Sequence, residues 1–345
     1  PTELMARPLS FRIWRLGILA LALTFSKSYA QVAKPFLADL QAHLKKAETV
    51  DSAHAEGKDG WFFYTRELRA MSVGPFWGKD ATGVSRASNT AYADPLAPIL
   101  DFHRQLEKAG IHLLLVPVPA KAMIYGEKLS AQAPPTASFP PVYLQFFQQL
   151  EAENLPVLDL TDRFSQAKTE GPVFCKTDTH WSGSAVRLAA TAISEKITAE
   201  GWLTPGTNDF RSSEKKISIH GDLMEMSGKN LKESLTVHAV SVPRTGKPIP
   251  IDRKSPLLLM GDSHTLVFHD PGLHASGAGL PDHLALTLKQ PVDLIGVRGS
   301  GATATRMSLV RRRDNLAGKK VVVWCFTMRE FTESSTGWRT LPVIR

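Results

Sequence analysis

The chain alternates short, continuously apolar runs with segments of helical periodicity, and this alternation limits its possible folds more than any other feature. Runs of this kind are typical of strands that are buried on both faces of a parallel sheet. Strands that alternate with helices pack into one sheet with helices on both faces. The sequence therefore predicts an α/β three-layer sandwich with a mainly parallel central sheet, whose strands we expect at 111–118, 157–160, a short run ending at Cys175, 257–260, 292–297 and 320–326.

Three segments place their apolar residues on one helical face, and we expect helices at 96–109, 142–152 and 182–200. The third segment has the clearest boundaries. Ser182 is a suitable N-terminal cap, and Gly201 can end the helix in a left-handed conformation. Gly110 supplies the same kind of ending to the first helix.

Residues 202–255 interrupt this alternation, because they are polar and contain many serines, lysines and prolines. Only 217–219 and 235–242 alternate as strands do. We therefore expect an irregular insertion or an edge region at 202–255. The chain is long enough to bury a complete core, and we expect residues 31–345 to form a single domain around it.

The first thirty residues have the layout of a secretory signal. Three arginines precede the apolar run 16–25, and the small-residue site Ser28-Tyr29-Ala30 follows it. The run is shorter than the roughly 20 residues that a membrane-spanning helix needs. We expect cleavage after Ala30 and a periplasmic destination, with an uncleaved inner-membrane anchor as the alternative.

The charge balance is moderately basic, with a formal net charge of +8. This balance suits an anionic partner such as a uronic-acid polymer, and we expect no nucleic-acid partner. Cys175 and Cys325 are the only cysteines, and in an oxidising compartment they either pair or remain buried thiols. Neither lies in a cluster with histidines at metal-ligand spacing, so we expect no metal and no cofactor.

The apolar run 257–260 leads directly into Gly261-Asp262-Ser263-His264. Open α/β sheets bind their ligands at the carboxyl ends of the strands, which is where this serine lies. A sharp turn after the strand would expose the hydroxyl, and free backbone N–H groups at the turn would stabilise an oxyanion. The alternative is an ordinary turn or N-cap serine.

A second polar segment, Thr177-Asp178-Thr179-His180-Trp181, lies immediately before the helix expected at 182–200. An acid and a histidine two residues apart can point to the same side of a turn. Asp178 would then hold His180 in one tautomer, and His180 would accept the proton of Ser263. In the alternative interpretation Asp178 caps the helix and His180 packs beside Trp181.

Taken together, the two segments resemble a known family. The Gly-Asp-Ser strand end is similar to the nucleophile block of SGNH hydrolases, in which the Asp and His normally follow the serine. Here they precede it, and this order resembles the alginate O-acetyltransferase AlgX/AlgJ family, whose SGNH-like domain has a circularly permuted motif order. The resemblance spans roughly residues 57–330 and is supported by 57–63, 116–121, 221–223 and 321–324.

The resemblance implies that Ser263 is the nucleophile, His180 the general base and acid, and Asp178 the residue that orients the imidazole. The implied reaction passes acetyl through an acetyl-serine intermediate to hydroxyls of an exopolysaccharide such as alginate. Because the sequence has no C-terminal carbohydrate-binding domain, it looks closer to the single-domain AlgJ type. That type implies a membrane-bound O-acyltransferase as the acetyl supplier.

Further residues are candidates for oxyanion or substrate binding. They are Gly299, Ser300, Gly301, Arg306, Lys121, Tyr125, Trp181 and His264. A tight turn for the glycines and a solvated surface lysine are the alternatives. Two other functions remain open at this point: a carbohydrate acetylesterase that uses the same triad, and a non-catalytic scaffold subunit of a polysaccharide export complex.

Overall fold

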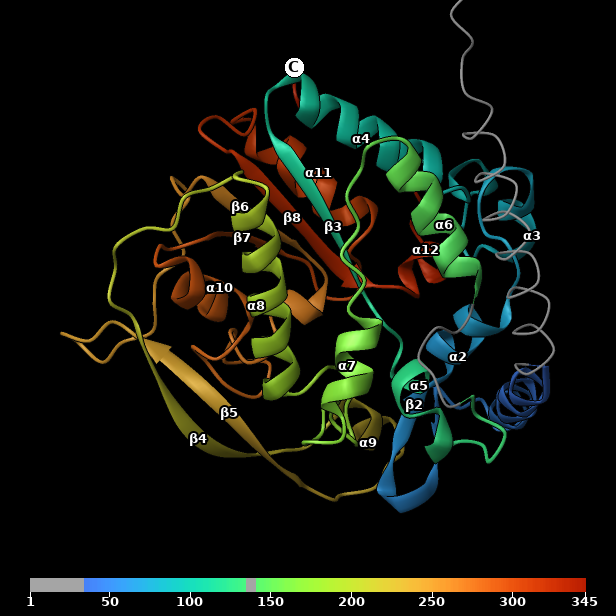
Figure 1. Cartoon of the computed structure of the whole chain (residues 1–345). Helices are drawn as coiled ribbons and strands as arrows, with labels where there is room; N and C mark the ends of the chain where they lie inside the picture. Colours follow the sequence, from blue (N-terminus) through green and yellow to red (C-terminus); the bar gives the residue numbers. More distant parts are fainter. Residues whose placement is uncertain (1–33, 135–140) are drawn as a thin grey trace, which may run out of the picture.

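The computed structural model describes residues 34–134 and 141–345, and at its centre lies a four-stranded parallel sheet (Figure 1). The strand order is β3-β8-β6-β7, and every neighbouring pair is parallel. The expected α/β fold with a parallel central sheet is confirmed. The strand bounds are β3 His112–Val118, β6 Leu257–Gly261, β7 Asp293–Gly296 and β8 Val321–Thr327.

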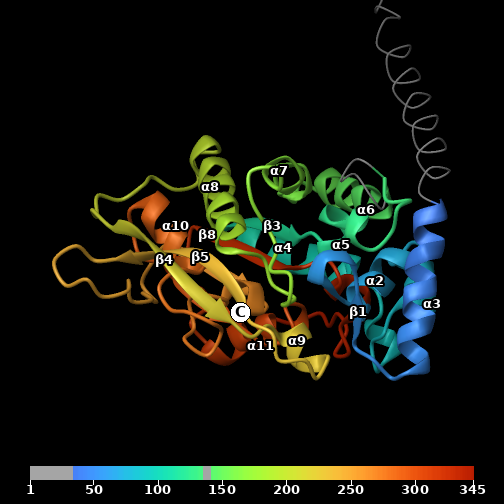
Figure 2. The ribbon, with the colours of Figure 1, turned by 90° about the horizontal axis from the view of Figure 1, so that it is seen from below.

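Helices cover both faces of the sheet. In β8, Val321, Val323 and Cys325 pack on one face with the residues of α7, α8 and α10, whereas Val322 and Trp324 pack on the other with α4, α6 and α11. Figure 2 shows α8 and α11 on opposite sides of the sheet. The helix bounds are α4 Leu96–Lys108, α6 Pro141–Ala152, α7 Thr161–Ala167, α8 Gly183–Ala199, α10 Leu280–Leu288 and α11 Thr303–Arg312.

The three helices expected from the sequence are confirmed as α4, α6 and α8. The hydroxyl of Ser182 accepts a hydrogen bond from the Ala185 amide, as an N-cap does, and Gly201 and Gly110 have positive φ angles of 68° and 70°. Of the two ranges described, neither contains a helix long and apolar enough to cross a membrane. The signal or anchor predicted at 1–30 lies outside the described residues.

Two expected strands are not strands. Val157 makes a single bridge to Leu115, and the run ending at Cys175 makes a single bridge between Phe174 and Trp181. After Val157, the Asp159 carboxylate accepts a hydrogen bond from the Thr161 amide and begins α7. This bond accompanies the turn of the chain into α7 directly after the bridge.

The segment 202–255 contains more regular structure than we predicted. β4 (Arg211–Ile219) and β5 (Glu233–Ser241) form a nine-residue antiparallel hairpin, so the prediction of an irregular insertion is wrong for these residues. β5 is alternately buried, and Gly183 of α8 lies close to its Val237. β4 is exposed along most of its length, which explains why its sequence lacks the alternation of a half-buried strand.

Short elements complete the region around the carboxyl ends of the strands. β1 and β2 form a hairpin near the start of the described chain, and α9 lies between β4 and β5. The bounds are β1 His54–Glu56, β2 Phe62–Tyr64, α2 Thr65–Ser72, α3 Ala81–Val84, α5 Lys121–Ile124, α9 Asp222–Met226 and α12 Glu330–Glu333, with 3-10 turns at Lys58–Gly60, Gly78–Asp80, Thr90–Tyr92, Gly126–Lys128 and Ser263–Thr265.

Candidate active site

Ser263 begins the 3-10 turn that follows β6, as the sequence predicted. The turn starts from a tight strand contact, because a Cβ at Gly261 would lie 1.6 Å from the carbonyl oxygen of Cys325. Asp262 then fixes the turn: its Oδ1 accepts from the His264 amide at 2.9 Å, and its Oδ2 accepts from the Thr327 amide at 2.9 Å. The nucleophile is therefore held by bonds to its own turn and to the neighbouring strand β8.

Ser263, His180 and Asp178 form a continuous hydrogen-bonded chain. Ser263 Oγ lies 2.8 Å from Nε2 of His180, and Nδ1 of the same ring lies 2.6 Å from Oδ1 of Asp178. A carboxylate can only accept, so Nδ1 carries the proton and Nε2 is left to accept the serine proton. This is the geometry of an activated serine nucleophile.

The protonation states of the site follow from its charges. Burial by itself lowers the pKa of His180, but the charge and hydrogen bond of Asp178 outweigh it and raise that pKa. Burial opposes the ionisation of Asp178, yet His180 and His274 hold its pKa well below the usual value. Asp178 is therefore a carboxylate at neutral pH, and it stabilises the imidazolium that forms when His180 takes a proton.

The second oxygen of Asp178 is also fully used. Oδ2 accepts from the Asp222 amide at 2.9 Å and from Nε2 of His274 at 2.8 Å. His274 has a φ of 75°, which is uncommon for a residue with a side chain. Sequence reasoning missed this histidine, because it lies in an irregular loop with no motif around it.

The loop that carries Asp178 and His180 is fastened by two further acids. Asp222 of α9 accepts hydrogen bonds from the amide and the hydroxyl of Thr179, at 2.7 and 2.5 Å. Glu233, the first residue of β5, accepts from the amides of Lys176 and Thr177. The hairpin and α9 thus position the loop, and only the motif Gly221-Asp222-Leu223 had indicated their involvement.

Lys121 and Tyr125 do not lie at a ligand surface, contrary to our expectation. Lys121 is fully buried, and its ammonium donates to the carbonyl oxygens of Asp178 (2.5 Å) and Phe62 (2.9 Å). The hydroxyl of Tyr125 accepts from the Val173 amide, and its ring stacks on Trp61 at 4.0 Å. Because these polar groups are already bonded to the protein, both residues support the Asp178 loop from behind.

Arg306 is also buried and away from any surface. Its guanidinium lies over the rings of Trp324 (5.3 Å) and Trp338 (5.7 Å), and burial lowers its pKa to about 9. The expected contact with substrate is therefore wrong for this residue in the described structure. The side chain instead fills the apolar layer beneath α11, where the aromatic rings stabilise its charge.

The loop Gly299-Ser300-Gly301 does reach the carboxyl end of the sheet, but the Gly301 amide and the Ser300 hydroxyl are already bonded to the protein. The Gly301 amide donates to Oε2 of Glu330 at 3.1 Å, and the Ser300 hydroxyl donates to the same atom at 3.2 Å. The Gly301 amide is thus unavailable to an oxyanion, contrary to expectation. Gly299 has a positive φ of 82°, which fits the alternative of a tight strand-to-helix turn.

Trp181 and His264 are wholly buried behind the catalytic imidazole. The His264 ring lies 4.8 Å from the His180 ring and 5.3 Å from the Trp181 ring. Burial lowers the pKa of His264, which keeps the ring neutral at neutral pH. The His264 ring therefore packs against His180 and the Trp181 ring packs against His264. Both are buried, so the expected contact with a substrate is wrong for these two residues.

One amide at Ser263 is free to act as an oxyanion donor. No described residue accepts a hydrogen bond from the Ser263 amide, which opens the 3-10 turn. An unbonded amide adjacent to the nucleophile is suited to stabilise the negative oxygen of a tetrahedral intermediate.

Donor atoms of Asp178, His180 and Asp222 lie within 4.8 Å of one another, as in a metal site. Each of them already takes part in a hydrogen bond with another group of the site, so a metal ion would have to displace these hydrogen bonds.

The two cysteines, Cys175 and Cys325, are buried free thiols. This decides between the disulfide and the buried thiols that the sequence had left open.

The sequence matches one family over residues 55–328, described as "SGNH hydrolase-like domain, acetyltransferase AlgX". Among similar curated proteins, the "Probable alginate O-acetylase AlgJ" of Pseudomonas putida is 27% identical over 79% of this chain and 69% of that protein. The protein of the same name from Pseudomonas aeruginosa is 31% identical over 42% of this chain, but the match spans only 32% of that protein.

Two solved structures share the fold. The O-acetyltransferase domain of Pseudomonas putida AlgJ has a TM-score of 0.61 at 24% identity and covers 81% of this chain and 92% of that one. Pseudomonas aeruginosa AlgX has a TM-score of 0.58 at 16% identity, with 80% of this chain and 62% of that chain covered. The family match covers most of the chain, and we conclude that this protein belongs to the family of SGNH hydrolase-like acetyltransferases represented by AlgX.

Proposed function

We propose that this chain is an O-acetyltransferase that carries acetyl on Ser263 and passes it to hydroxyls of an exopolysaccharide such as alginate in the periplasm. The observation that carries the proposal is the hydrogen-bonded chain from Ser263 through His180 to Asp178. Membership of an acetyltransferase family and the names of the AlgJ relatives support the acetyl group and the polysaccharide acceptor. A membrane-bound O-acyltransferase is the proposed acetyl supplier.

In the first half-reaction, Ser263 Oγ attacks the carbonyl carbon of the acetyl donor while His180 Nε2 takes the hydroxyl proton. The carbonyl oxygen becomes an oxyanion, which the Ser263 amide stabilises. Collapse of this intermediate breaks the bond to the leaving group, and His180 returns the proton to that group. The products are acetyl-Ser263 and the protonated leaving group.

In the second half-reaction, a sugar hydroxyl attacks the acetyl carbon of acetyl-Ser263, and His180 takes the hydroxyl proton. Collapse of the second intermediate breaks the bond to Ser263 Oγ, which regains the proton from His180. The sugar leaves as an acetyl ester. Asp178 remains ionised throughout and stabilises the imidazolium in both halves.

The test is mass spectrometry of the purified protein after brief exposure to a chromogenic acetyl ester, with and without an oligouronate. We expect one acetyl group on Ser263 that is discharged onto sugar when the oligouronate is present. Ser263→Ala should take up none, whereas Ser213→Ala, which changes an exposed serine of β4, should behave as the unmodified protein. Discharge only to water would replace the transferase with an acetylesterase, and absence of any adduct would favour a scaffold subunit.

A further inference from the structure

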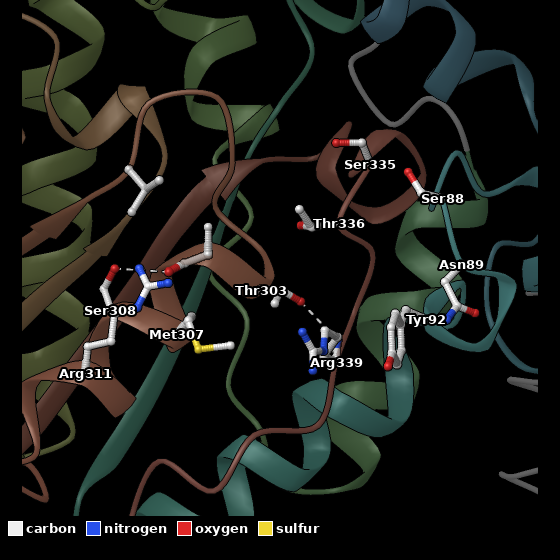
Figure 3. A pocket seen from close by; sticks show the side chains of 12 residues that line it. Ser88, Asn89, Tyr92, Thr303, Met307, Ser308, Arg311, Ser335, Thr336 and Arg339 are labelled. Atoms are coloured by element: carbon white, nitrogen blue, oxygen red, sulfur yellow. Dashed lines mark hydrogen bonds between the residues drawn. The ribbon is translucent and has the colours of Figure 1, made fainter.

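A pocket of about 510 Å³ lies between α11 and two segments from distant parts of the chain (Figure 3). One wall is the face of α11 that carries Thr303, Met307 and Arg311. The opposite wall consists of residues 88–92 and 335–339, which are joined by a hydrogen bond of 2.9 Å between the Ser88 amide and the Ser335 carbonyl. The volume lies within the range of small-molecule sites.

The pocket adjoins the end of the strand that carries the nucleophile. Val297, which lines it, donates its amide to the carbonyl oxygen of Gly261 at 3.0 Å. Gly261 is two residues before Ser263, and β7 is the direct neighbour of β6. The pocket and the nucleophile therefore share the carboxyl end of the sheet, where α/β folds bind ligands.

Two guanidinium groups give the pocket its charge. Arg311 and Arg339 both line it and are exposed, and no carboxylate of the described residues forms an ion pair with either. None of the described lining residues is an aspartate or a glutamate. The neighbouring Arg312, in contrast, is paired with Asp293 at 2.8 Å. Two arginines without ion-pair partners, in a pocket without acidic side chains, favour an anionic ligand. A carboxylate can accept two parallel hydrogen bonds from one guanidinium group.

The remaining lining suits a sugar ring. The guanidinium of Arg339 lies 5.2 Å from the centre of the Tyr92 ring, which holds the arginine head at the pocket wall. Tyr92 and Met307 offer apolar contact, and serine and threonine hydroxyls lie around them, as Figure 3 shows. A pyranose with a carboxylate presents the matching combination of an apolar ring face, hydroxyls and one negative charge.

We infer that this pocket binds a carboxylate-bearing sugar unit of the acceptor, with Arg311 and Arg339 as the carboxylate ligands. The inference rests on the proposed function, since it places one unit of the polysaccharide at the same end of the sheet as Ser263. An acceptor held in this way would bind more weakly as the salt concentration rises, because both arginines are exposed to screening. Neither arginine takes part in the transfer of the acetyl group.

The experiment measures binding of a short oligomannuronate by calorimetry, with the same oligomer reduced to its neutral form as the second ligand. Arg311→Gln and Arg339→Gln should each weaken oligomannuronate binding about tenfold, with little effect on the neutral oligomer. Arg313→Gln is the matched control, because Arg313 is exposed beside α11 but does not line the pocket. Thermal denaturation checks that all three variants fold like the unmodified protein.

Acetylation of Ser263 by a small ester, followed by mass spectrometry, separates the two proposals. We expect the control variant Arg313→Gln to take up acetyl at the unmodified rate. If the two pocket variants bind oligomannuronate as tightly as the unmodified protein, if Arg313→Gln weakens binding as much, or if the unmodified protein binds none, the inference is wrong. If binding depends on Arg311 and Arg339 while Ser263 takes no acetyl, the proposed function fails and the uronate site stands.

Discussion

Asp178 accepts hydrogen bonds from three separate parts of the chain. The amide and ring of His180 reach Oδ1, whereas the Asp222 amide and the His274 ring reach Oδ2. Each donor restricts the rotation of the carboxylate, and the direction of the carboxylate sets the direction of His180. At the scale of single residues, the orientation of His180 therefore depends on Asp222 and His274 as well as on Asp178.

The first prediction concerns His274 as a positioning residue. His274→Ala should lower kcat for acetyl transfer about tenfold, because one donor to Asp178 is lost, while KM for the acetyl ester stays near its unmodified value. His274→Gln should recover part of the loss, since its amide N–H can donate to Oδ2. Steady-state kinetics of the two variants make the test, and equal loss in both would assign His274 a purely structural role.

The second prediction concerns the pH dependence of Ser263 acetylation. Only neutral His180 can take the serine proton, and Asp178 raises the pKa of His180 above its usual 6.5. The rate should therefore fall as the pH drops through a value above 6.5. Asp178→Asn should slow the reaction and move the fall in rate to lower pH, because the negative charge that raises the pKa of His180 is removed.

A smaller shift in the same direction is expected for Asp222→Asn. The Oδ2 atom of Asp222 lies 4.0 Å from His180 Nδ1, so its charge also raises the pKa of the ring, but less than Asp178 does. Stopped-flow acetylation across a pH series would measure all three proteins. If the acetylation rate of the unmodified protein falls only at or below pH 6.5, the assignment of His180 as the general base is contradicted.

The sequence was sufficient to predict that Asp178, His180 and Ser263 come together, but it was insufficient for most of their neighbours. Ser263 and His180 lie in short motifs next to a strand end and a helix start, so local pattern predicted that their side chains meet, and the two are hydrogen-bonded. Lys121 lies shortly after β3 and Arg306 lies within α11, and in neither place does the pattern reveal which way the side chain points. Whether a cation faces solvent or the protein depends on tertiary packing, which brought carbonyls to Lys121 and indole rings to Arg306.

At the scale of elements, α9 is held unusually close to the catalytic loop. A Cβ at Gly221 would lie 2.1 Å from the carbonyl oxygen of Thr177, a distance that real side chains do not adopt. This contact brings the Asp222 amide and carboxylate to Asp178 and Thr179. The glycine is therefore required by the approach of two backbones and not by a left-handed conformation.

The third prediction follows from that contact. Gly221→Ala should push α9 away from the loop and lower acetyl transfer by tenfold or more, on the order of the effect of misplaced catalytic groups, with modest loss of stability. Gly83→Ala in α3 is the control, because a Cβ there meets nothing within 4 Å and the residue is helical. Activity and thermal denaturation of both variants make the test, and an active Gly221→Ala protein would refute the argument.

The elements themselves were predictable where burial imposes a pattern. The apolar strands β3, β6, β7 and β8 and the helices α4, α6 and α8 match the expected ranges closely. β4 was missed in most of its length, because a strand exposed on both faces selects residues such as Arg211, Lys215 and Lys216 and loses its alternation. β4 is a strand because it pairs with β5, and the local sequence of β4 gives no sign of this pairing.

At the scale of the whole molecule, a buried acid couples folding to pH. Glu330 is 4% exposed and accepts from the Gly301 amide and the Ser300 hydroxyl, yet burial raises its pKa to about 7 from a usual 4.5. Below pH 4.5 the group is protonated whether the chain is folded or not. Between 4.5 and about 7 the folded chain keeps a proton that the unfolded chain has lost, so stability falls as pH rises.

The fourth prediction is that Glu330→Gln removes this dependence. The free energy of unfolding of the unmodified protein should contain a decrease of up to about 3 kcal/mol across that window from this group. The glutamine keeps an acceptor for the Gly301 amide but does not titrate. Denaturant unfolding at a series of pH values makes the test, with Glu214→Gln on exposed β4 as the control that should leave the curve unchanged.

An exposed turn lies in the chain between the segment with Asp178 and His180 and the segment with Ser263. Residues 243–248 between β5 and β6 are all exposed and include Arg244, so a trypsin-like protease can cut after this arginine. A cut there leaves Asp178 and His180 on one polypeptide and Ser263 on the other. Because β3 belongs to the first piece and pairs with β8 of the second, the nicked protein should stay assembled and active until denaturant separates the halves, after which neither half alone can be acetylated.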